Sequence, residues 1–248
     1  MKELAKIKRQ ILGCEISDYS YEEILQYVEN CIENNKRLNL TYVNAHLALL
    51  VKKNPNFQKL LNSFFIYTDG IGIFCAKRML LKEQSFRTVA TDLNSLILEL
   101  ADKRKFRVFF FGGSVQACIV LRDKLKSLFP SLCVTGIMSR EIQINDELIE
   151  KLNASESDIL FVGLGTARQE EWIVQNEVNV NIPVKIAVGS GIDYLAGTYK
   201  RAPKIMQRVG LEWLFRLIYD PRRLWRRYIL GLPHFIYLVA KDYIKAGK

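Results

Sequence analysis

Short apolar runs alternate with segments of helical spacing along the first four fifths of the chain. Runs rich in β-branched and aromatic residues occur at 38–43, 64–68, 107–112, 158–165 and 185–191. Each run predicts a strand. Because the runs are almost continuously apolar, they are typical of parallel strands that helices cover on both faces. The pattern predicts an α/β fold with a Rossmann-like, mostly parallel sheet flanked by helices.

Two helices are predicted from local signals. Ser20 and Glu23 have the spacing of a capping box, and apolar residues then recur at every fourth position from Ile24. A first helix is therefore expected to run to about Asn35. The segment 115–129 has the same helical spacing, with leucines on one face.

The chain changes character near residue 198. Residues 198–248 hold 12 Lys and Arg against three acidic residues, a net charge of +9, while the whole chain carries +10. Trp, Tyr, Phe and Leu lie between these basic residues. Pro221 and Pro233 are expected to divide the segment into three short helices, because proline interrupts a helix. We predict a core over 1–197 and a small helical appendage over 198–248.

The basic, aromatic appendage has three interpretations: a surface for membrane or anionic lipid, an RNA-binding surface, or plain solvated structure. Trp and Tyr favour the membrane interface and Lys and Arg are attracted to anionic lipid, which favours the first. The run 228–240 contains a proline and is too short to span a bilayer. Its composition suits a helix that lies in the membrane surface.

The remaining composition predicts a cytoplasmic location. Residues 1–17 have no apolar run of signal-peptide length, and no uncharged apolar stretch of about 18 residues occurs anywhere. The five cysteines are scattered, odd in number and without a CxxC pair. Reduced, mostly buried thiols are the expected state of such cysteines.

Polar and glycine-rich groups follow the predicted strands, where parallel sheets place their ligand sites. Asn44 follows the first run and Asp69 the second, and Asp69 precedes a flexible Gly-Ile-Gly turn. This carboxylate has two interpretations: a general base that accepts a proton from a hydroxyl, or a cap of the next helix. Gly112 and Gly113 open a turn that is suited to an anion at a helix N-terminus, although any tight turn also favours glycine.

Metal chemistry has little support in the sequence. The two histidines lack ligand partners at suitable spacing, and no D-x-D occurs. If the substrate carries a diphosphate leaving group, arginines would have to stabilise it in place of a metal, because they bind phosphate in a bidentate manner. Arg87 lies in the core, and the appendage carries a cluster of arginines at positions 201, 216, 222, 223, 226 and 227.

Several motifs occur in order along the chain. They are ILGCEIS at 11–17, YVNAH around Asn44, YTDGIGI around Asp69, RTVATDL from Arg87, DILFVGLGTARQEEW at 158–172, AVGSGIDYLAGTYKRAP at 187–203 and GLEWLFRLIYDPRR at 210–223. With these motifs the chain resembles the WecG/TagA/CpsF family of glycosyltransferases (glycosyltransferase family 26) over nearly its whole length.

The resemblance implies an inverting enzyme that uses no metal and no cofactor. It would move a sugar, of the N-acetylmannosamine type, from a UDP-sugar to a polyprenyl-diphosphate-linked sugar for a cell-surface polysaccharide or teichoic acid. Asp69 would be the base and Arg87 a second catalytic residue, while Arg216, Arg223 and Arg226 would contact the diphosphate. The other substrate-binding candidates are Thr41, Asn44, Gly112, Gly113, Gly163, Gly165, Gln169, Glu170 and Gly189.

The expected partners follow from the same resemblance. They are the UDP-sugar, the lipid-linked acceptor and the cytoplasmic membrane surface, with which the enzyme would associate peripherally; nucleic acid is not expected, and self-association into a homo-oligomer stays open. Two other classes of protein predict different sequence features. A nucleotide-dependent oxidoreductase predicts a GxGxxG turn, which is missing. A non-enzymatic RNA- or lipid-binding protein predicts no need for Asp69.

Overall fold

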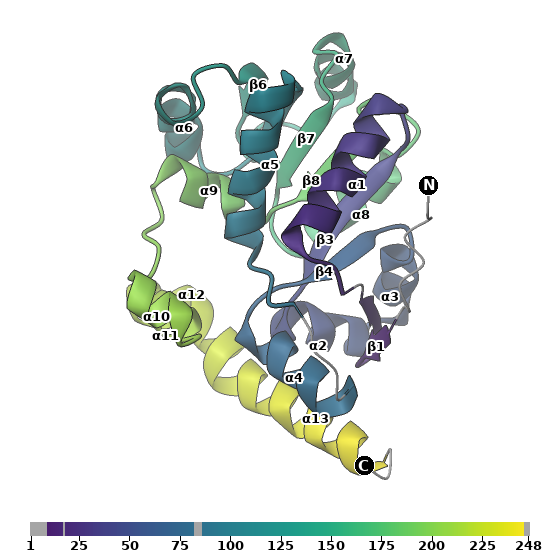
Figure 1. Cartoon of the computed structure of the whole chain (residues 1–248), viewed down its shortest axis with the longest axis vertical. Helices are drawn as coiled ribbons and strands as arrows, with labels where there is room; N and C mark the ends of the chain where they lie inside the picture. The colour runs from purple at the N-terminus through teal and green to yellow at the C-terminus, as the bar shows by residue number, and fades with distance from the viewer. Residues whose placement is uncertain (1–8, 17, 82–85, 246–248) are drawn as a thin grey trace.

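The computed structural model describes residues 9–16, 18–81 and 86–245. Its centre is a six-stranded parallel sheet with the strand order β4-β3-β8-β7-β5-β6 (Figure 1). The strands are β3 (Leu38–Val43), β4 (Phe65–Thr68), β5 (Arg107–Gly112), β6 (Cys133–Met138), β7 (Ile159–Gly163) and β8 (Val184–Ala187). A separate antiparallel hairpin is formed by β1 (Arg9–Ile11) and β2 (Cys14–Ile16).

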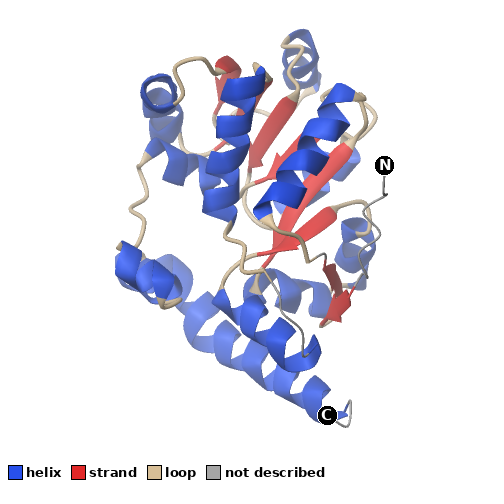
Figure 2. Cartoon of the chain, in the orientation of Figure 1, coloured by secondary structure: helices blue, strands red, loops and turns tan. Residues whose placement is uncertain are grey.

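Helices cover both faces of the sheet (Figure 2). One face packs against α1 (Tyr21–Glu33), α5 (Ala90–Arg104), α6 (Val115–Leu128) and α9 (Gly191–Ala196). The other face packs against α2 (Ala45–Lys53), α3 (Pro55–Leu61), α4 (Ile71–Leu81), α7 (Asp146–Ala154) and α8 (Arg168–Gln175). Strand β5 shows why its sequence is apolar throughout: Val108 and Phe110 enter one core while Phe109 and Phe111 enter the other.

The predicted α/β architecture is confirmed. All five predicted strands are present, although the last ends at Ala187 rather than near residue 191. The capping box also forms, since the amide of Glu23 donates to Ser20 Oγ (3.2 Å) and the amide of Ser20 donates to Glu23 Oε2 (2.8 Å). Strand β6 was missed because it lies at the sheet edge, is only partly buried and contains Gly136.

The appendage begins with α10 (Lys204–Arg208) and α11 (Glu212–Tyr219) and continues through α12 (Pro221–Trp225), the π-helical η1 (Arg226–Gly231) and α13 (Leu232–Lys245). The prediction that Pro233 ends a helix is wrong, because α12, η1 and α13 follow one another without a break. A proline inside a helix clashes with the carbonyl four residues earlier. The wider π turn just before Pro233 accommodates this clash.

The final helix also packs against the core. Helix α13 runs along α4, below the sheet in the view of Figure 1. Phe235 and Val239 of α13 are 2% and 3% exposed and belong to the same apolar cluster as residues of α2 and α4. One face of α13 is therefore part of the hydrophobic core.

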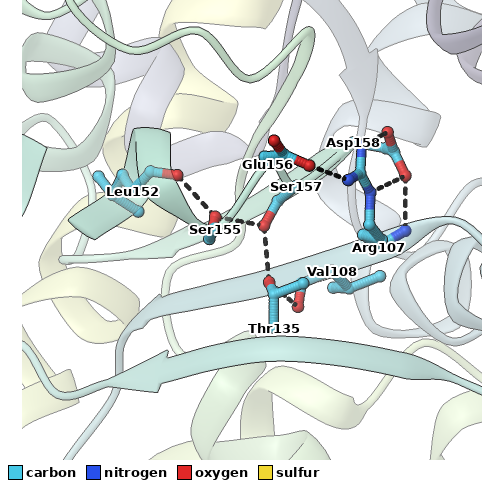
Figure 3. Close-up of polar contacts among 8 residues, drawn as sticks. All are labelled: Arg107, Val108, Thr135, Leu152, Ser155, Glu156, Ser157 and Asp158. Carbon is cyan, nitrogen blue, oxygen red and sulfur yellow. Dashed lines mark hydrogen bonds and ion pairs between the residues drawn. The ribbon is translucent and has the colours of Figure 1, made fainter. Parts of the chain in front are cut away.

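A polar network ties the amino-terminal ends of three strands together, at the opposite end of the sheet from the polar groups predicted as the site (Figure 3). The Arg107 side chain contacts Asp158 and Glu156, and the Asp158 carboxylate also accepts from the Arg107 amide. Ser157 joins Ser155 to Thr135 through hydroxyl hydrogen bonds of 2.7 and 2.6 Å. These contacts position the strands but lie away from the site.

Two further sequence expectations concern cysteines and membrane spans. All five cysteines lie in the described residues and are free, but only Cys14 and Cys31 are buried, so the expectation of mostly buried thiols is wrong. Cys75 and Cys133 are exposed. Among the helices that the structure describes, none has both the length and the apolar character needed to cross a bilayer.

Candidate active site

Asp69 stands directly after β4, at the carboxyl end of the sheet. Its amide donates to the carbonyl of Val43 (2.8 Å), which continues the sheet by one residue. Its Oδ1 accepts from the amide of Ala90 (2.9 Å), the first residue of α5. Asp69 therefore caps a helix that is distant in sequence, rather than the helix that follows it. The positive end of the α5 dipole favours the ionised form of this carboxylate.

Two cavities meet at Asp69. Both are clefts that are partly open to solvent, which is the usual form of a small-molecule site. Asn44, Asp69, Arg216 and Arg227 line both cavities. A group in either cavity therefore lies beside the same carboxylate and the same two guanidinium groups.

The first cavity lies between the core and the appendage. Its core wall includes His46, Gly70 and Arg87, and its appendage wall includes Trp213 and Tyr228, together with Glu212 and Leu232. Burial and the nearby Arg227 lower the pKa of His46 to about 4, so this imidazole is neutral at physiological pH. The wall thus combines apolar surface with a small number of polar groups.

The second cavity is more polar and extends over the ends of β7 and β8. It is lined by Gly165 and Gly189, by Asn94 of α5, and by Tyr194 and Arg223, with further residues at 91, 166, 188, 190 and 191. Tyr42, at the end of β3, forms part of the same wall, and burial raises its pKa well above the ordinary value. Its polar wall, which includes three arginines, is suited to a ligand that carries phosphate groups.

Opposing effects set the pKa of Asp69. Burial raises it above the ordinary value of a carboxyl group, and the charge of Glu212 raises it further. The hydrogen bond from Ala90 and the charges of Arg216 and Arg227 act in the opposite direction. The net shift is upward, which makes Asp69 a stronger base than an exposed aspartate.

Three appendage arginines reach the cavities. Arg216 donates to Glu212 Oε1 (2.5 Å) and lies 4.8 Å from the centre of the Tyr194 ring. Arg223 donates to Asp220 Oδ2 (2.6 Å) and lies over the ring of Tyr199. Arg227 lines both cavities and was not among the predicted site residues.

Arg226, which the sequence favoured, lies elsewhere. Its guanidinium stacks on the ring of Trp225 at 5.3 Å, and it lines neither of the two cavities. Arg226 and Arg227 are adjacent on the π-helical η1, so their side chains point in different directions. The motif spacing alone did not distinguish them.

Arg87 joins the core to the appendage. Its guanidinium nitrogens donate to the carbonyls of Gln207 (2.8 Å) and Arg208 (3.2 Å), at the end of α10. It also lines the first cavity. A second link is the ion pair between Arg201 and Asp92, at 2.7 Å. These contacts hold the appendage over the carboxyl ends of the strands.

Three predicted binding residues form a buried network beneath the second cavity. Gln169 and Glu170 are 0% exposed, as is Thr41. The Glu170 carboxylate accepts from the Thr41 hydroxyl (2.8 Å) and the Gln169 amide (2.9 Å), and Gln169 Oε1 accepts from the amide of Gly189 (2.8 Å). The network positions Gly189, which does line the cavity. In this structure the three side chains support the cavity wall from behind.

In the glycine turn at the end of β5, two backbone amides already donate to other protein groups. The Gly113 amide donates to the carbonyl of Gly163, and the Ser114 amide donates to the buried carboxylate of Asp193. A Cβ at Gly112 would lie 2.5 Å from the backbone of Gly163, so glycine is required for close packing there. Neither Gly112, Gly113 nor Gly163 lines the two cavities.

Asn44 caps α2 and lines both cavities. Its Oδ1 accepts from the amides of His46 and Leu47, each at 3.1 Å. Among the described residues, no group of three or more His, Cys, Asp or Glu side chains has the geometry to hold a metal ion. That the reaction needs no metal stays a prediction, which activity in the presence of a chelator would test.

The comparison with known families decides which class of protein this chain is. Residues 9–248 match the profile of the glycosyl transferase WecG/TagA/CpsF family. The chain belongs to this family. It is therefore a glycosyltransferase, and the oxidoreductase and the non-enzymatic binding protein are set aside.

Three relatives match most of the length of this chain. An N-acetylglucosaminyldiphosphoundecaprenol N-acetyl-beta-D-mannosaminyltransferase of Bacillus spizizenii is 30% identical over 90% of this chain and 88% of the relative. The Bacillus subtilis protein of the same name is 30% identical over 82% of this chain and 79% of its own. The Staphylococcus aureus protein of that name is 26% identical over 97% and 95%.

Proposed function

We propose that this glycosyltransferase moves N-acetylmannosamine from UDP to a polyprenyl-diphosphate-linked N-acetylglucosamine, with inversion at the anomeric carbon. The names of the three relatives support this donor sugar and this acceptor. The observation that carries the proposal is the position of Asp69, whose carboxylate lies where the two cavities meet.

The two cavities divide the substrates. The second, polar cavity takes the UDP-sugar, with the nucleotide over the ends of β7 and β8 and the sugar directed toward Asp69. The first cavity takes the sugar of the acceptor. This arrangement lets an acceptor hydroxyl approach the anomeric carbon from the face opposite UDP, as a single displacement requires.

Asp69 acts as the general base. The acceptor hydroxyl gives its proton to the free carboxylate oxygen as the hydroxyl oxygen bonds to the anomeric carbon. The bond from that carbon to the β-phosphate oxygen breaks, and its electron pair leaves with UDP. Because burial raises the pKa of Asp69, proton transfer is more favourable than to an exposed aspartate, and the Ala90 hydrogen bond fixes the carboxylate.

Arginines of the appendage stabilise the departing diphosphate. Arg216 and Arg227 line both cavities and Arg223 lines the second, so all three border the proposed donor site. Guanidinium groups bind phosphate oxygens with charge-assisted hydrogen bonds, and such contacts are strongest in a partly dry cavity. The three side chains take the part that a divalent cation plays in other transferases.

The appendage also brings the enzyme to its lipid-linked substrate. Several of its large apolar side chains are highly exposed, among them Ile205, Ile218, Leu230 and Ile244 at 75%, 69%, 58% and 73%. Exposed apolar side chains next to arginines are typical of helices that bind the surface of anionic membranes. We expect the appendage to lie on the cytoplasmic face of the membrane.

A donor panel tests the proposal. Purified full-length protein is incubated with undecaprenyl-diphosphate N-acetylglucosamine in anionic vesicles and with UDP-N-acetylmannosamine, UDP-N-acetylglucosamine or UDP-glucose, each with and without EDTA. Transfer is expected with UDP-N-acetylmannosamine at the same rate in both conditions. Transfer only from another donor would overturn the donor assignment, and loss of activity with EDTA would overturn the metal-independent mechanism.

A further inference from the structure

A groove on the surface of the appendage opens beside the first cavity. Its walls come from α11, η1 and α13, and include Leu214, Leu217, Ile229, Ile236 and Tyr237. We refer to it as the apolar groove. Nearly all of its exposed wall is contributed by carbon atoms, in contrast to the second cavity, whose wall is mainly polar.

The apolar groove adjoins the first cavity. Trp213, Tyr228 and Leu232 line both of them. A ligand that lies over these three side chains would contact the first cavity at one end and the groove at the other. The end in the first cavity then lies beside Asp69, which lines that cavity.

Charged side chains line the first cavity, and apolar side chains line the adjoining groove. The first cavity holds the carboxylates of Asp69 and Glu212, and the guanidinium groups of Arg216 and Arg227. Arg227 directly precedes Tyr228, which belongs to the shared wall. Beyond Tyr228, no charged side chain lines the groove among the described residues. A sugar, a diphosphate and a hydrocarbon chain in sequence would match this order.

We propose that the apolar groove binds the isoprene units nearest the diphosphate of the acceptor. The inference rests on the proposed function, and it extends the recognised part of the substrate from the sugar to the lipid itself. Several isoprene units leave the bilayer and enter the groove, so their burial contributes to acceptor affinity even where no membrane is present. General contact between the appendage and a bilayer would not produce this effect.

The appendage offers matched pairs of residues for a test. Ile236 lines the groove and is 57% exposed, while Ile244, on the same helix, lies outside the groove and is 73% exposed. Ile229 lines the groove and its neighbour Leu230 does not, although their exposed fractions are 57% and 58%. Since all four side chains are exposed, replacing them with serine does not remove a core contact.

The experiment compares two water-soluble acceptors without vesicles or detergent: N-acetylglucosaminyl diphosphate carrying a farnesyl chain, and the same molecule carrying a methyl group. The wild-type enzyme is expected to show the lower KM for the farnesyl acceptor. Ile236→Ser and Ile229→Ser are expected to raise that KM about tenfold each, as loss of one buried isoleucine contact would. Neither substitution should change the KM for the methyl acceptor by more than about twofold. Ile244→Ser and Leu230→Ser should change neither value.

Three results would overturn the proposal. One is equal KM values of the wild type for the two acceptors. Another is equal effects of the groove substitutions and their controls, which would indicate nonspecific apolar contact between the appendage and the farnesyl chain. The third is an unchanged farnesyl KM in both groove variants. In these cases sugar transfer continues and the proposed function stands, whereas absence of transfer to any acceptor, including the undecaprenyl substrate in vesicles, would overturn the function and the groove together.

Discussion

Asp69 and Asn44 directly follow strands β4 and β3 of the parallel sheet, whereas Arg216, Arg223 and Arg227 lie on the helical appendage. The two sheet residues are fixed by backbone amides of the core. Two of the arginines instead contact carboxylates of their own appendage, Arg216 with Glu212 and Arg223 with Asp220.

This difference indicates how the site works. A base must have one position relative to the reacting hydroxyl, and rigid sheet ends provide it. Arginines that pair with carboxylates of the appendage can give up these hydrogen bonds and bind the diphosphate when the donor binds. They can bind the same carboxylates again when UDP leaves. The core thus supplies a fixed base, and the appendage supplies cations whose partners change during turnover. Four predictions test this comparison.

The largest effect is expected for Asp69→Asn. The asparagine oxygen can still accept from Ala90, so the fold should persist, but no group remains to take the hydroxyl proton. We expect kcat to fall by about 10³-fold, within the range for loss of a general base. The melting temperature should be unchanged or higher, because a partly desolvated carboxylate that has a raised pKa favours the unfolded state at neutral pH. Near-normal turnover would exclude Asp69 as the base.

The next largest effect should separate two adjacent arginines. Arg227→Ala is expected to lower kcat/KM by about 100-fold, since one charge-stabilising donor typically contributes that much. Arg226→Ala is the matched control and should stay within about twofold of the wild type in a vesicle-free assay, because Arg226 lines neither cavity. The reverse order of effects would favour the sequence-based assignment over the structural one.

Phe235→Ala tests whether the appendage depends on the core for its position. Phe235 is 2% exposed, and loss of such a side chain costs about 3–5 kcal/mol of unfolding free energy. Urea unfolding measures this loss, and kcat should fall as well because the arginines lose their support. In a vesicle-free assay, Ile244→Ala, at an exposed position on the same helix, should change neither quantity. A stable Phe235→Ala protein would show that α13 is held by other contacts.

The smallest expected effect is a shift in pH dependence with Glu212→Gln. Asp69 must be ionised to act as a base, so its raised pKa places the acid limb of the kcat profile above the ordinary range of a carboxylate. Glu212 contributes to that rise, and its removal should lower the pKa of Asp69 and move the acid limb to lower pH. Glu212→Asp keeps the charge and is the control. An acid limb that stays in place would mean that Glu212 does not act on Asp69.

Local patterns predicted much of this protein because they reflect local physics. Continuous apolar runs identified the buried strands, and Ser20 with Glu23 identified the start of α1. The position of Asp69 directly after a buried strand indicates a site residue, because parallel sheets bind their ligands at the carboxyl ends of the strands. The basic, aromatic composition of the appendage marked it as a distinct segment.

Other features depended on contacts between distant segments. Gln169 and Glu170 have the polarity of ligand-binding residues, but only packing against β3 and β8 placed them behind the cavity wall. The partner of Asp69 is Ala90, 21 residues away, which no local spacing indicates. The choice of Arg227 over Arg226 depends on the direction that η1 takes across the core.

By itself, the sequence determined five of the six strands of the sheet, the first helix, the candidate base and the basic, aromatic composition of the appendage, because these depend on neighbouring residues in the chain. The tertiary structure alone decided which arginine faces the cavities, why Pro233 leaves the helix unbroken, and where the apolar groove adjoins the cavity beside Asp69. Those outcomes depend on how helices pack across the sheet ends, where small rotations determine which side chain is buried and which faces a ligand.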